Sequence, residues 1–509
     1  MGDLSEIAWT DRQSETIAVP AFWQDHRFQG NAVLPAVEAM QLLAVWAVRM
    51  RPGLRVDHMA NASFDKFLAI APGTARLEAH CHLGGLTDGG VRAALVTRTQ
   101  AKTATITRVK EHVTVEFVNP GEPAAAPAMD MAAALEGFCH RVEPARIYRD
   151  LVPFGPAFQT IHQPLQLSAD GALAWLRAPD AAPGNTGGPL GSPFPLDGAF
   201  HAACAWSQRF ANIVAFPVGI GRRMILKPTR SGQDYIGRVV PVRNDRQELV
   251  FDIWILDSDG QVREVAKDVR MRDVSGGRLV PPDWIAADLS GDRLADLEAQ
   301  CDGLALIELE QLMPFAALAL STHEMARFDK MGPGRRVSYL GARLACKRLW
   351  RRLAGDEGRT DARQIETVAS DQIRPCCPTT VQDRAPFCAV SHDRRFAVAV
   401  AGDEPLGVDV EREATSLDKA WHIYMHPAEQ LRAQQSELGR SAAAVRVWSI
   451  KEAVAKAAGL DLADAWHQTE VTAIGARESR FRLLDHGPAR AFHQCVDGHV
   501  FTLVNGLKS

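Results

Sequence analysis

A layout that occurs twice in the first half of the chain most constrains how this sequence can fold. In each copy a stretch rich in Pro and Gly leads into one apolar segment, and several strand-like runs follow. The apolar segments, residues 35–49 and 196–210, have their apolar positions at helical spacing, which predicts two helices. An apolar helix followed by strands buries itself by packing against a sheet. The sequence therefore predicts an α+β fold with a duplicated unit, the first copy over 1–120 and the second over 135–275.

The predicted strands are rich in β-branched residues and are bounded by turn-forming residues. They cover 75–82, 91–100 and 103–118 in the first copy, and 235–242, 249–256 and 262–272 in the second. The two copies have little sequence similarity, so the duplication rests on this shared order of elements.

The last part of the chain has a different character, because strands and helices alternate there. Residues 396–401 and 407–410 are predicted to be paired strands, and 442–458 a long helix. A second helix is predicted over 335–353, with its leucines on one side and with seven Lys and Arg residues. We therefore predict a separate unit over 300–509.

Composition excludes several classes of protein. A formal net charge of −4 over 509 residues does not suit a nucleic-acid-binding chain. No apolar run approaches the ~20 residues that a membrane span needs, and the first residues lack the basic and apolar regions of a signal peptide. The nine cysteines are scattered without a CxxC pair and are predicted to be reduced thiols. The expectation is a cytoplasmic, multidomain protein with no nucleic-acid or membrane partner.

Two short motifs lie at the starts of the two predicted apolar helices. His26 and Gly30 precede the first helix, which Pro35 opens, while Asp197 and His201 lie one turn apart in the second. A histidine beside free helix amides can remove a proton alpha to a carbonyl that those amides polarise. Taken singly, each motif also has an ordinary structural explanation, since an isolated histidine is commonly structural and an aspartate near a helix start commonly caps it.

Together these motifs resemble those of polyketide synthase dehydratases. Residues 26–35 resemble the family's HxxxGxxxxP motif, and Asp197 with His201 resembles its DxxxQ/H motif. Between them, Phe154-Gly-Pro-Ala-Phe-Gln resembles the YGPxFQ motif with Phe in place of Tyr. The resemblance implies a double hotdog that removes water from a 3-hydroxyacyl thioester on an acyl carrier protein and gives a trans-2-enoyl product. It also implies a possible homodimer and no cofactor for this half.

The resemblance assigns a role to each residue of the two motifs. His26 would take the alpha proton, Asp197 would protonate the departing hydroxyl and His201 would orient that hydroxyl. The amide near Gly30 would bind the thioester carbonyl. Phe154 lacks the hydroxyl that the family's tyrosine has, so any hydrogen bond from that tyrosine is missing.

A second constellation lies in the last part of the chain. Asp409 and Glu411 are two residues apart on an extended segment, so both side chains point to the same side. Lys451, Glu452 and Lys456 fall close together on the predicted helix 442–458. Carboxylates with nearby lysines suit a Mg²⁺–diphosphate site. A solvated strand face and a surface helix with ordinary charge pairs are the simpler explanations of the two pieces.

The combination resembles the phosphopantetheinyl transferase signature, a GxDxE strand followed by a WxxKExxxK helix. Ser391-His392 resembles the family's SH motif, and the basic helix from Arg335 resembles its CoA-contacting region. The resemblance implies a pseudo-twofold, two-lobed α/β unit. It also implies transfer of 4′-phosphopantetheine from CoA to a carrier-protein serine, with release of 3′,5′-ADP.

The residues implied by this second resemblance fall into two groups. Asp409, Glu411 and Glu452 would hold Mg²⁺, and Glu452 would also help to deprotonate the serine, with Lys456 on the phosphates. The residues implied to contact CoA are His392 at the 3′-phosphate, Lys451, and, as weaker candidates, Arg335 and Arg336.

Two alternatives stay open at this point. The transferase could be joined to a product-template-like cyclase or a non-catalytic acyl-binding hotdog module, because a fold does not fix a chemistry. Alternatively, both halves could only recruit carrier proteins. The sequence has no recognisable ketosynthase, acyltransferase or carrier domain, so the expected partner is the carrier domain of a separate polyketide or polyunsaturated-fatty-acid-type synthase subunit.

Overall fold

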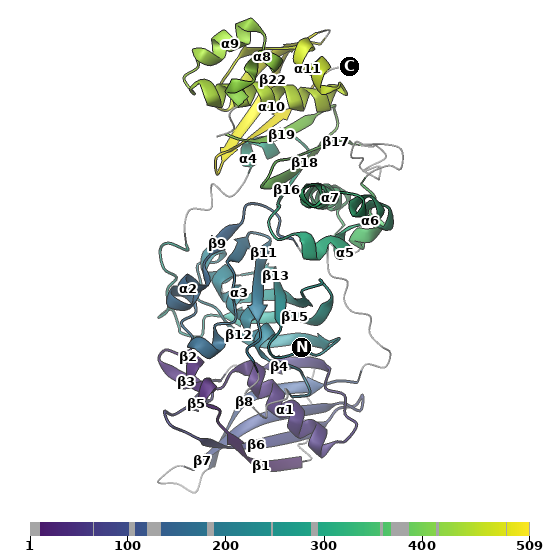
Figure 1. The fold of residues 1–509 in the computed structure, drawn as a ribbon. Helices are drawn as coiled ribbons and strands as arrows, with labels where there is room; N and C mark the ends of the chain where they lie inside the picture. The colour runs from purple at the N-terminus through teal and green to yellow at the C-terminus, as the bar shows by residue number, and fades with distance from the viewer. Residues whose placement is uncertain are drawn as a thin grey trace. The chain divides into compact units, whose positions relative to one another are not determined.

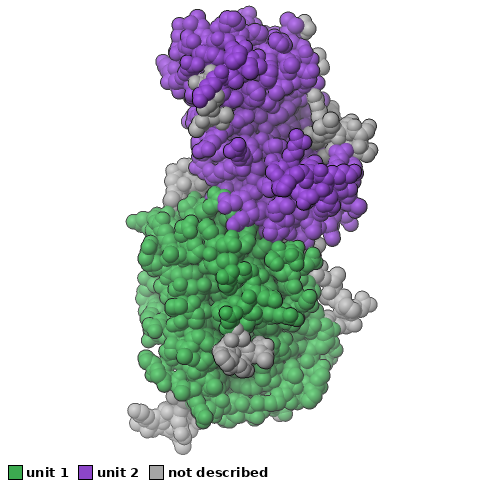
Figure 2. Space-filling model, viewed as in Figure 1, with its two compact units in different colours: residues 1–127, 140–287 green, residues 128–139, 288–509 purple. Residues whose placement is uncertain are grey.

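The computed structural model describes most of the chain and divides it into two compact units. Unit 1 comprises residues 1–127 and 140–287, and unit 2 comprises residues 128–139 and 288–509 (Figure 2). Within these units the described residues are 11–64, 66–100, 107–119, 134–180, 188–245, 248–286, 294–356, 360–367, 386–413, 417–484 and 486–507.

Unit 1 is built on one 12-stranded sheet that carries one long helix for each half (Figure 1). In the first half, helix α1 (Ala36–Met50) packs its apolar residues against strands β6, β7 and β8. The strands of this half are β1 (Asp11–Ala18), β4 (His58–Ser63), β6 (Arg76–Gly85), β7 (Val91–Gln100) and β8 (Thr107–Phe117). A small separate sheet contains β2 (Arg27–Phe28), β3 (Asn31–Val33) and β5 (Ala69–Ile70).

The second half of unit 1 repeats this plan around helix α3 (Phe194–Phe210), which packs on strands β11, β13 and β14. Strands β4 and β12 pair antiparallel and join the two halves into one sheet. This arrangement is a double hotdog. Its remaining elements are β9 (His140–Val142), α2 (Pro144–Arg146), β10 (Leu165–Ser168), β11 (Gly171–Arg177), β12 (Phe216–Ile225), β13 (Asp234–Asn244), β14 (Leu249–Asp257) and β15 (Val262–Arg272).

Unit 2 has two lobes, each a sheet with one long helix. The first sheet has the order β16-β18-β17 and packs on α7, and the second has the order β19-β23-β22-β21-β20 and packs on α10 (Figure 1). The helices are α4 (Ala295–Glu298), α5 (Ala316–Ala319), α6 (Thr322–Asp329), α7 (Pro333–Ala354), α8 (Trp421–Tyr424), α9 (Pro427–Gln434), α10 (Arg440–Ala458) and α11 (Leu462–Gln468). The strands are β16 (Gly303–Glu308), β17 (Phe387–His392), β18 (Phe396–Gly402), β19 (Gly407–Arg412), β20 (Thr469–Ala473), β21 (Glu478–Leu483), β22 (Gly487–Val496) and β23 (His499–Val504).

Three features of the fold differ from the sequence analysis. Strands β18 and β19 are not paired, because they belong to different sheets, with residues 403–406 as the connection. Residues 135–139, expected in the second repeat, belong to unit 2. Cys388 is disulfide-bonded, so the expectation of reduced thiols is wrong for this residue. No helix among the described residues is both long and apolar enough to cross a membrane.

Candidate active sites

The first candidate site is in unit 1, where His26 follows a 3₁₀ turn and precedes the β2–β3 hairpin. Its Nδ1 lies 3.1 Å from the carbonyl oxygen of Val33. A carbonyl oxygen can only accept a hydrogen bond, so Nδ1 carries the proton in this contact. The other ring nitrogen, Nε2, is left with a lone pair that can accept a proton.

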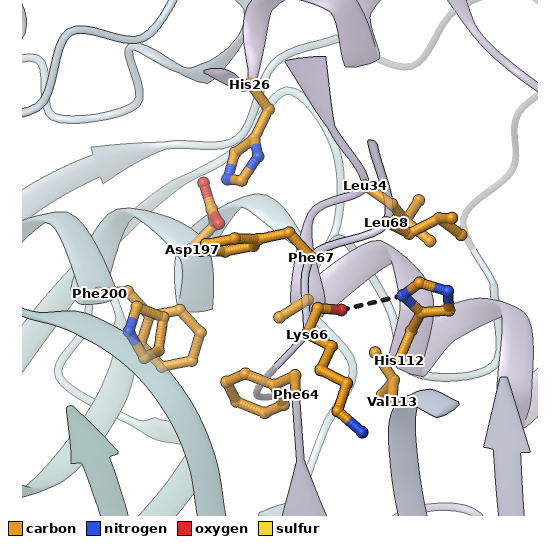
Figure 3. Close-up of a pocket in the computed structure, with 12 residues that line it drawn as sticks. His26, Leu34, Phe64, Lys66, Phe67, Leu68, His112, Val113, Asp197 and Phe200 are labelled. Atoms are coloured by element: carbon orange, nitrogen blue, oxygen red, sulfur yellow. Dashed lines mark hydrogen bonds between the residues drawn. The ribbon is translucent and has the colours of Figure 1, made fainter. Parts of the chain in front are cut away.

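Asp197 lies in the first turn of α3, and Figure 3 shows the His26 ring directed toward its carboxylate. The Asp197 Oδ2 and His201 Nε2 atoms are 3.0 Å apart, and both side chains are buried. The residue after Asp197 is glycine because a Cβ on Gly198 would collide with the hydroxyl of Thr160. The structure therefore brings the histidine of one motif and the aspartate of the other into one site.

Aromatic rings form the wall of this site. The centroid of the Phe154 ring lies 4.4 Å from the ring centroid of His26 and 5.1 Å from that of His201. Burial lowers the pKa of His26 below its ordinary value of 6.5, and the nearby charge of Asp197 opposes that shift. His26 is therefore neutral at neutral pH, as a general base must be.

The cavity beside His26 and Asp197 is narrow, with a volume of about 50 Å³. Most of its other lining residues are apolar: Leu34, Ala36, Phe64, Phe67, Leu68, Val113, Phe200 and Pro217, together with Lys66 and His112. Gly30 is not among them. It is exposed at the tip of the β2–β3 hairpin with a φ of +81°, and the expectation that the amide near Gly30 binds the thioester carbonyl stays a prediction.

Two groups near this site, the buried Tyr148 and the half-buried Glu38, carried no motif in the sequence. The Tyr148 hydroxyl lies 3.4 Å from His201 Nδ1 and accepts a hydrogen bond from the Ile161 amide at 2.8 Å. Burial raises the pKa of Glu38, in the first turn of α1, to about 7, and the negative charge of Asp197 adds to the shift. An acidic residue within an apolar helix is the signal that could have identified Glu38.

The second candidate site is in unit 2, and Asp409 of β19 lies at its centre. Its Oδ1 accepts hydrogen bonds from Ser391 at 2.8 Å and Lys456 at 3.1 Å, and its Oδ2 accepts one from Ser449 at 2.8 Å. The motif begins with Gly407 because β19 packs directly on α10, where a Cβ would collide with the backbone of Ala453. That close approach brings the Asp409 strand to the helix that carries Lys456.

Glu411 and Glu452 complete the acidic part of this site. The Trp448 indole donates a hydrogen bond to Glu411 Oε1 at 3.0 Å. Burial raises the pKa of Glu411 to about 7, and the charge of Asp409 contributes. Burial, followed by the charge of Asp409, also raises the pKa of Glu452. The charge of Asp409 therefore destabilises the charged forms of both glutamates, which is the electrostatic setting that a bound cation relieves.

The three carboxylates have the chemistry of a Mg²⁺ site. Asp409, Glu411 and Glu452 line one cavity of about 500 Å³, and all three supply the hard oxygen ligands that Mg²⁺ takes. Among the described residues no group of three His, Cys, Asp or Glu side chains forms a ready-made metal site. Mg²⁺ is ordinarily held by one or two carboxylates, with waters and substrate phosphates as the other ligands. Carboxylates that share a cavity without forming a closed cluster are therefore consistent with such a site.

Positive and polar side chains line the rest of this cavity. Arg335, Ser338, Tyr339 and Arg343 of α7 face it, as do Ser391 and the exposed His392. Of these residues, Arg335 and His392 were predicted from their motifs, whereas Tyr339 and Arg343 belong to no motif. Arg343 is buried and also donates to the Thr367 carbonyl and hydroxyl, both at 3.0 Å. Cationic groups across a cavity from carboxylates suit an anionic ligand that brings its own cation.

Two other residues that were predicted to contact CoA do not line this cavity. The Lys451 ammonium is fully buried away from the cavity and bonds to Glu429 Oε2 at 2.8 Å and to the Tyr424 carbonyl at 2.7 Å. Arg336 donates to the carbonyls of Met331 and Asp329 instead of lining the cavity. Both side chains therefore stabilise the fold.

The buried Lys451–Glu429 pair leads to a stability prediction. Lys451→Met leaves the Glu429 carboxylate buried without its cation, so we expect the free energy of unfolding of unit 2 to fall by about 3–5 kcal/mol. Denaturant titration followed by tryptophan fluorescence measures this change. The double variant Lys451→Met/Glu429→Gln should recover part of the loss, and a loss below about 1 kcal/mol in the single variant would contradict a buried ionic pair.

Comparisons with known families and structures match both halves of the chain. Residues 126–279 match the family model described as the polyketide synthase dehydratase N-terminal domain, a range that includes Asp197 and His201 but not His26. Residues 405–504 match the 4′-phosphopantetheinyl transferase superfamily, and this range includes the three carboxylates and Lys456. No curated protein matches the chain significantly.

Several solved dehydratase domains are similar to the first half. One is from a mycocerosic acid synthase-like polyketide synthase, with 18% identity over 52% of this chain and 92% of that chain and a TM-score of 0.42. Another is a trans-AT polyketide synthase dehydratase domain from Brevibacillus brevis, with 21% identity over 51% and 93% and a TM-score of 0.42. From the family matches, the chain carries a polyketide synthase dehydratase region within 126–279 and a 4′-phosphopantetheinyl transferase superfamily region within 405–504.

Proposed function

We propose that this protein is a bifunctional enzyme that acts twice on carrier proteins. Unit 2 transfers 4′-phosphopantetheine from CoA to a carrier-protein serine, and unit 1 dehydrates a 3-hydroxyacyl group on that arm to the trans-2-enoyl product. The observation that carries the proposal is the pairing of His26 with Asp197 in one unit and the convergence of Asp409, Glu411 and Glu452 in the other. The proposed partner is a carrier protein of a polyketide or polyunsaturated-fatty-acid-type synthase.

Dehydration requires a base and an acid on the two carbons that become the double bond. His26 Nε2 accepts the proton alpha to the thioester, since its Nδ1 proton is held by the Val33 carbonyl. Asp197 must enter this step protonated; it gives that proton to the departing hydroxyl, which leaves as water, and becomes the carboxylate. His201, 3.0 Å from Asp197, fixes the position of that carboxyl group. The aromatic wall keeps bulk water from the reacting carbons.

Transfer requires a serine alkoxide to attack the β-phosphorus of CoA while the bond to 3′,5′-ADP breaks. Asp409, Glu411 and Glu452 would hold Mg²⁺, which would supply neutralisation of the charge that develops on the leaving phosphate. Glu452 accepts the serine proton, directly or through water. Lys456, tied to Asp409 and to the Val408 carbonyl, presents its ammonium to the phosphates. His392 and Arg335, which line the same cavity, would bind the 3′-phosphate.

Two assays test the proposal. For transfer, an apo carrier protein is incubated with CoA and Mg²⁺, and the mass gain of one phosphopantetheine group is followed. For dehydration, a 3-hydroxyacyl carrier protein is incubated with the intact chain, and the enoyl product is detected by mass and absorbance. A cyclised product in place of the enoyl product would identify the product-template-like alternative.

Chelation separates the two proposed activities. EDTA is expected to abolish transfer, because the carboxylates of the proposed transferase site act through a divalent cation. It should leave dehydration unchanged, because His26 and Asp197 need no metal. Both rates are measured on the same sample before and after Mg²⁺ is restored. Transfer that persists after chelation contradicts the metal assignment, and a matching loss of dehydration contradicts the separation of the sites.

The dehydratase should also have a characteristic dependence on pH. His26 acts as a base only when neutral, and burial lowers its pKa, so activity should hold below pH 6.5 and fall as the pH drops through the lowered value. The electrostatic interaction with His201 contributes to this lowering, so His201→Gln should move the acidic limb of kcat/KM to higher pH. The pH profiles of both proteins provide the test. An acidic limb already complete at pH 6.5 in the intact chain would contradict this assignment of the base.

A further inference from the structure

A short stretch of chain between the two hotdog repeats in sequence is part of unit 2. Residues 134–139 run along β16, where Glu136 forms an antiparallel bridge with Ile307 and the Gly137 amide donates to the Leu306 carbonyl at 2.8 Å. In its sheet β16 is an edge strand. Edge strands present unpaired backbone groups, and this segment pairs with some of them.

Helix α7 anchors the same segment from one side. Arg348 donates to the Ala134 carbonyl at 2.8 Å, and its guanidinium lies 3.5 Å from the Glu136 carboxylate. Arg352 forms a second ion pair with Glu136. One acidic side chain between two arginines of a single helix fixes the register of the segment on the lobe.

Phe138 carries the segment into the core of unit 2. Its side chain is buried, and its ring packs edge-on against Phe396 at 5.3 Å and Phe501 at 5.9 Å. Phe396 belongs to β18 in one sheet, and Phe501 belongs to β23 in the other. Phe138 therefore fills the joint between the two lobes.

This joint packs against the strands that carry residues of the proposed site, β17 and β19. Phe501 is paired with Val410, the residue between Asp409 and Glu411 on β19. Val410 points into the core that contains Phe138, so its two acidic neighbours point to the opposite side. On the other lobe, β18 pairs with β17, the strand that ends in His392. A void at the joint would let the carboxylates of β19 move away from His392 of β17.

We propose that residues 134–139 are a positioning element of the transferase site, with Phe138 as the positioning residue. The segment that links the hotdog repeats supplies the side chain that sets the β17 and β19 strands at their working separation. This inference rests on the proposed transferase function for its kinetic readout, whereas its structural readout does not depend on that function.

The test uses the full-length chain with Phe138→Ala, Phe138→Leu and a matched control, Phe251→Ala, which removes a fully buried phenylalanine from unit 1. Transfer is measured as kcat and as KM for CoA, and amide hydrogen exchange is followed in β17 and β19. A misplacement of ~1 Å can cost about 10²-fold in rate. We therefore expect Phe138→Ala to lose about 10²-fold in kcat/KM, with most of the loss restored in Phe138→Leu.

Each outcome bears on the inference. Faster exchange in β17 and β19 for Phe138→Ala, but not for Phe251→Ala, supports it even if no variant transfers phosphopantetheine, a result that would sink only the proposed function. Unchanged exchange and unchanged transfer in Phe138→Ala overturn it. If Phe138→Ala fails to fold, a chain with residues 128–139 replaced by a Gly/Ser linker of equal length is used. Recovery of transfer or protection on adding the 128–139 peptide supports the inference, and no recovery overturns it.

Discussion

Replacement of Glu452 by glutamine is expected to reduce phosphopantetheine transfer by about 10²–10⁴-fold, the range observed when a general base is removed. Glutamine keeps the shape of the side chain but cannot accept the serine proton, and it removes one negative charge from the proposed Mg²⁺ site. The measurement is the rate of mass gain of an apo carrier protein at saturating CoA and Mg²⁺.

Glu470→Gln is a suitable control for this variant. Glu470 also belongs to unit 2, but it forms a partly exposed ion pair with Arg432 instead of lining the cavity. Its replacement should leave transfer unchanged. Dehydration by the Glu452 variant should also equal that of the intact chain, because the residues proposed for dehydration lie in unit 1. Full transfer activity in Glu452→Gln would show that another group takes the proton.

Replacement of His26 by alanine is expected to reduce dehydration by a similar factor, about 10²–10⁴-fold. The loss follows because His26 is the only titratable group of the cavity that both faces Asp197 and has a ring nitrogen free to accept a proton, within the part of the chain that the structure describes. His112, which also lines the cavity, has both ring nitrogens engaged, by the Lys66 carbonyl and the Thr97 hydroxyl.

The dehydration assay uses a 3-hydroxyacyl carrier protein and follows the enoyl product. His80→Ala provides the control, since His80 lies on β6 of the same unit and does not line the cavity. Transfer by the His26 variant should equal that of the intact chain. If His26→Ala forms the enoyl product at the original rate, the dehydration mechanism proposed for unit 1 is wrong.

Local patterns were sufficient to predict the helices and the motif residues that share one face. The helices expected at 35–49, 196–210 and 442–458 are present as α1, α3 and α10, because their apolar spacing reports the buried face directly. Asp409 and Glu411 could be placed together because alternate residues of a strand share one side.

Contacts between distant residues were beyond the reach of these patterns. Lys451 and Glu452 are neighbours in the sequence, so their side chains point about 100° apart around the helix axis. The sequence does not show which of the two side chains is buried. The structure directs Lys451 toward Glu429, on another helix. Tyr148 meets His201 only through the tertiary fold. Likewise, nothing within residues 134–139 indicates that their partner is a strand far along the chain.

The path of the chain through its two units has a consequence for how such a protein could arise and be divided. The polypeptide passes from one unit to the other three times, near residues 127, 139 and 287. A single recombination event at residue 287 would therefore not move the transferase as an intact cassette, because one piece of its sheet is encoded upstream. Cleavage of the chain near residue 287 should likewise yield two fragments that copurify, since the amino-terminal fragment retains residues 134–139 seated on β16 of the other.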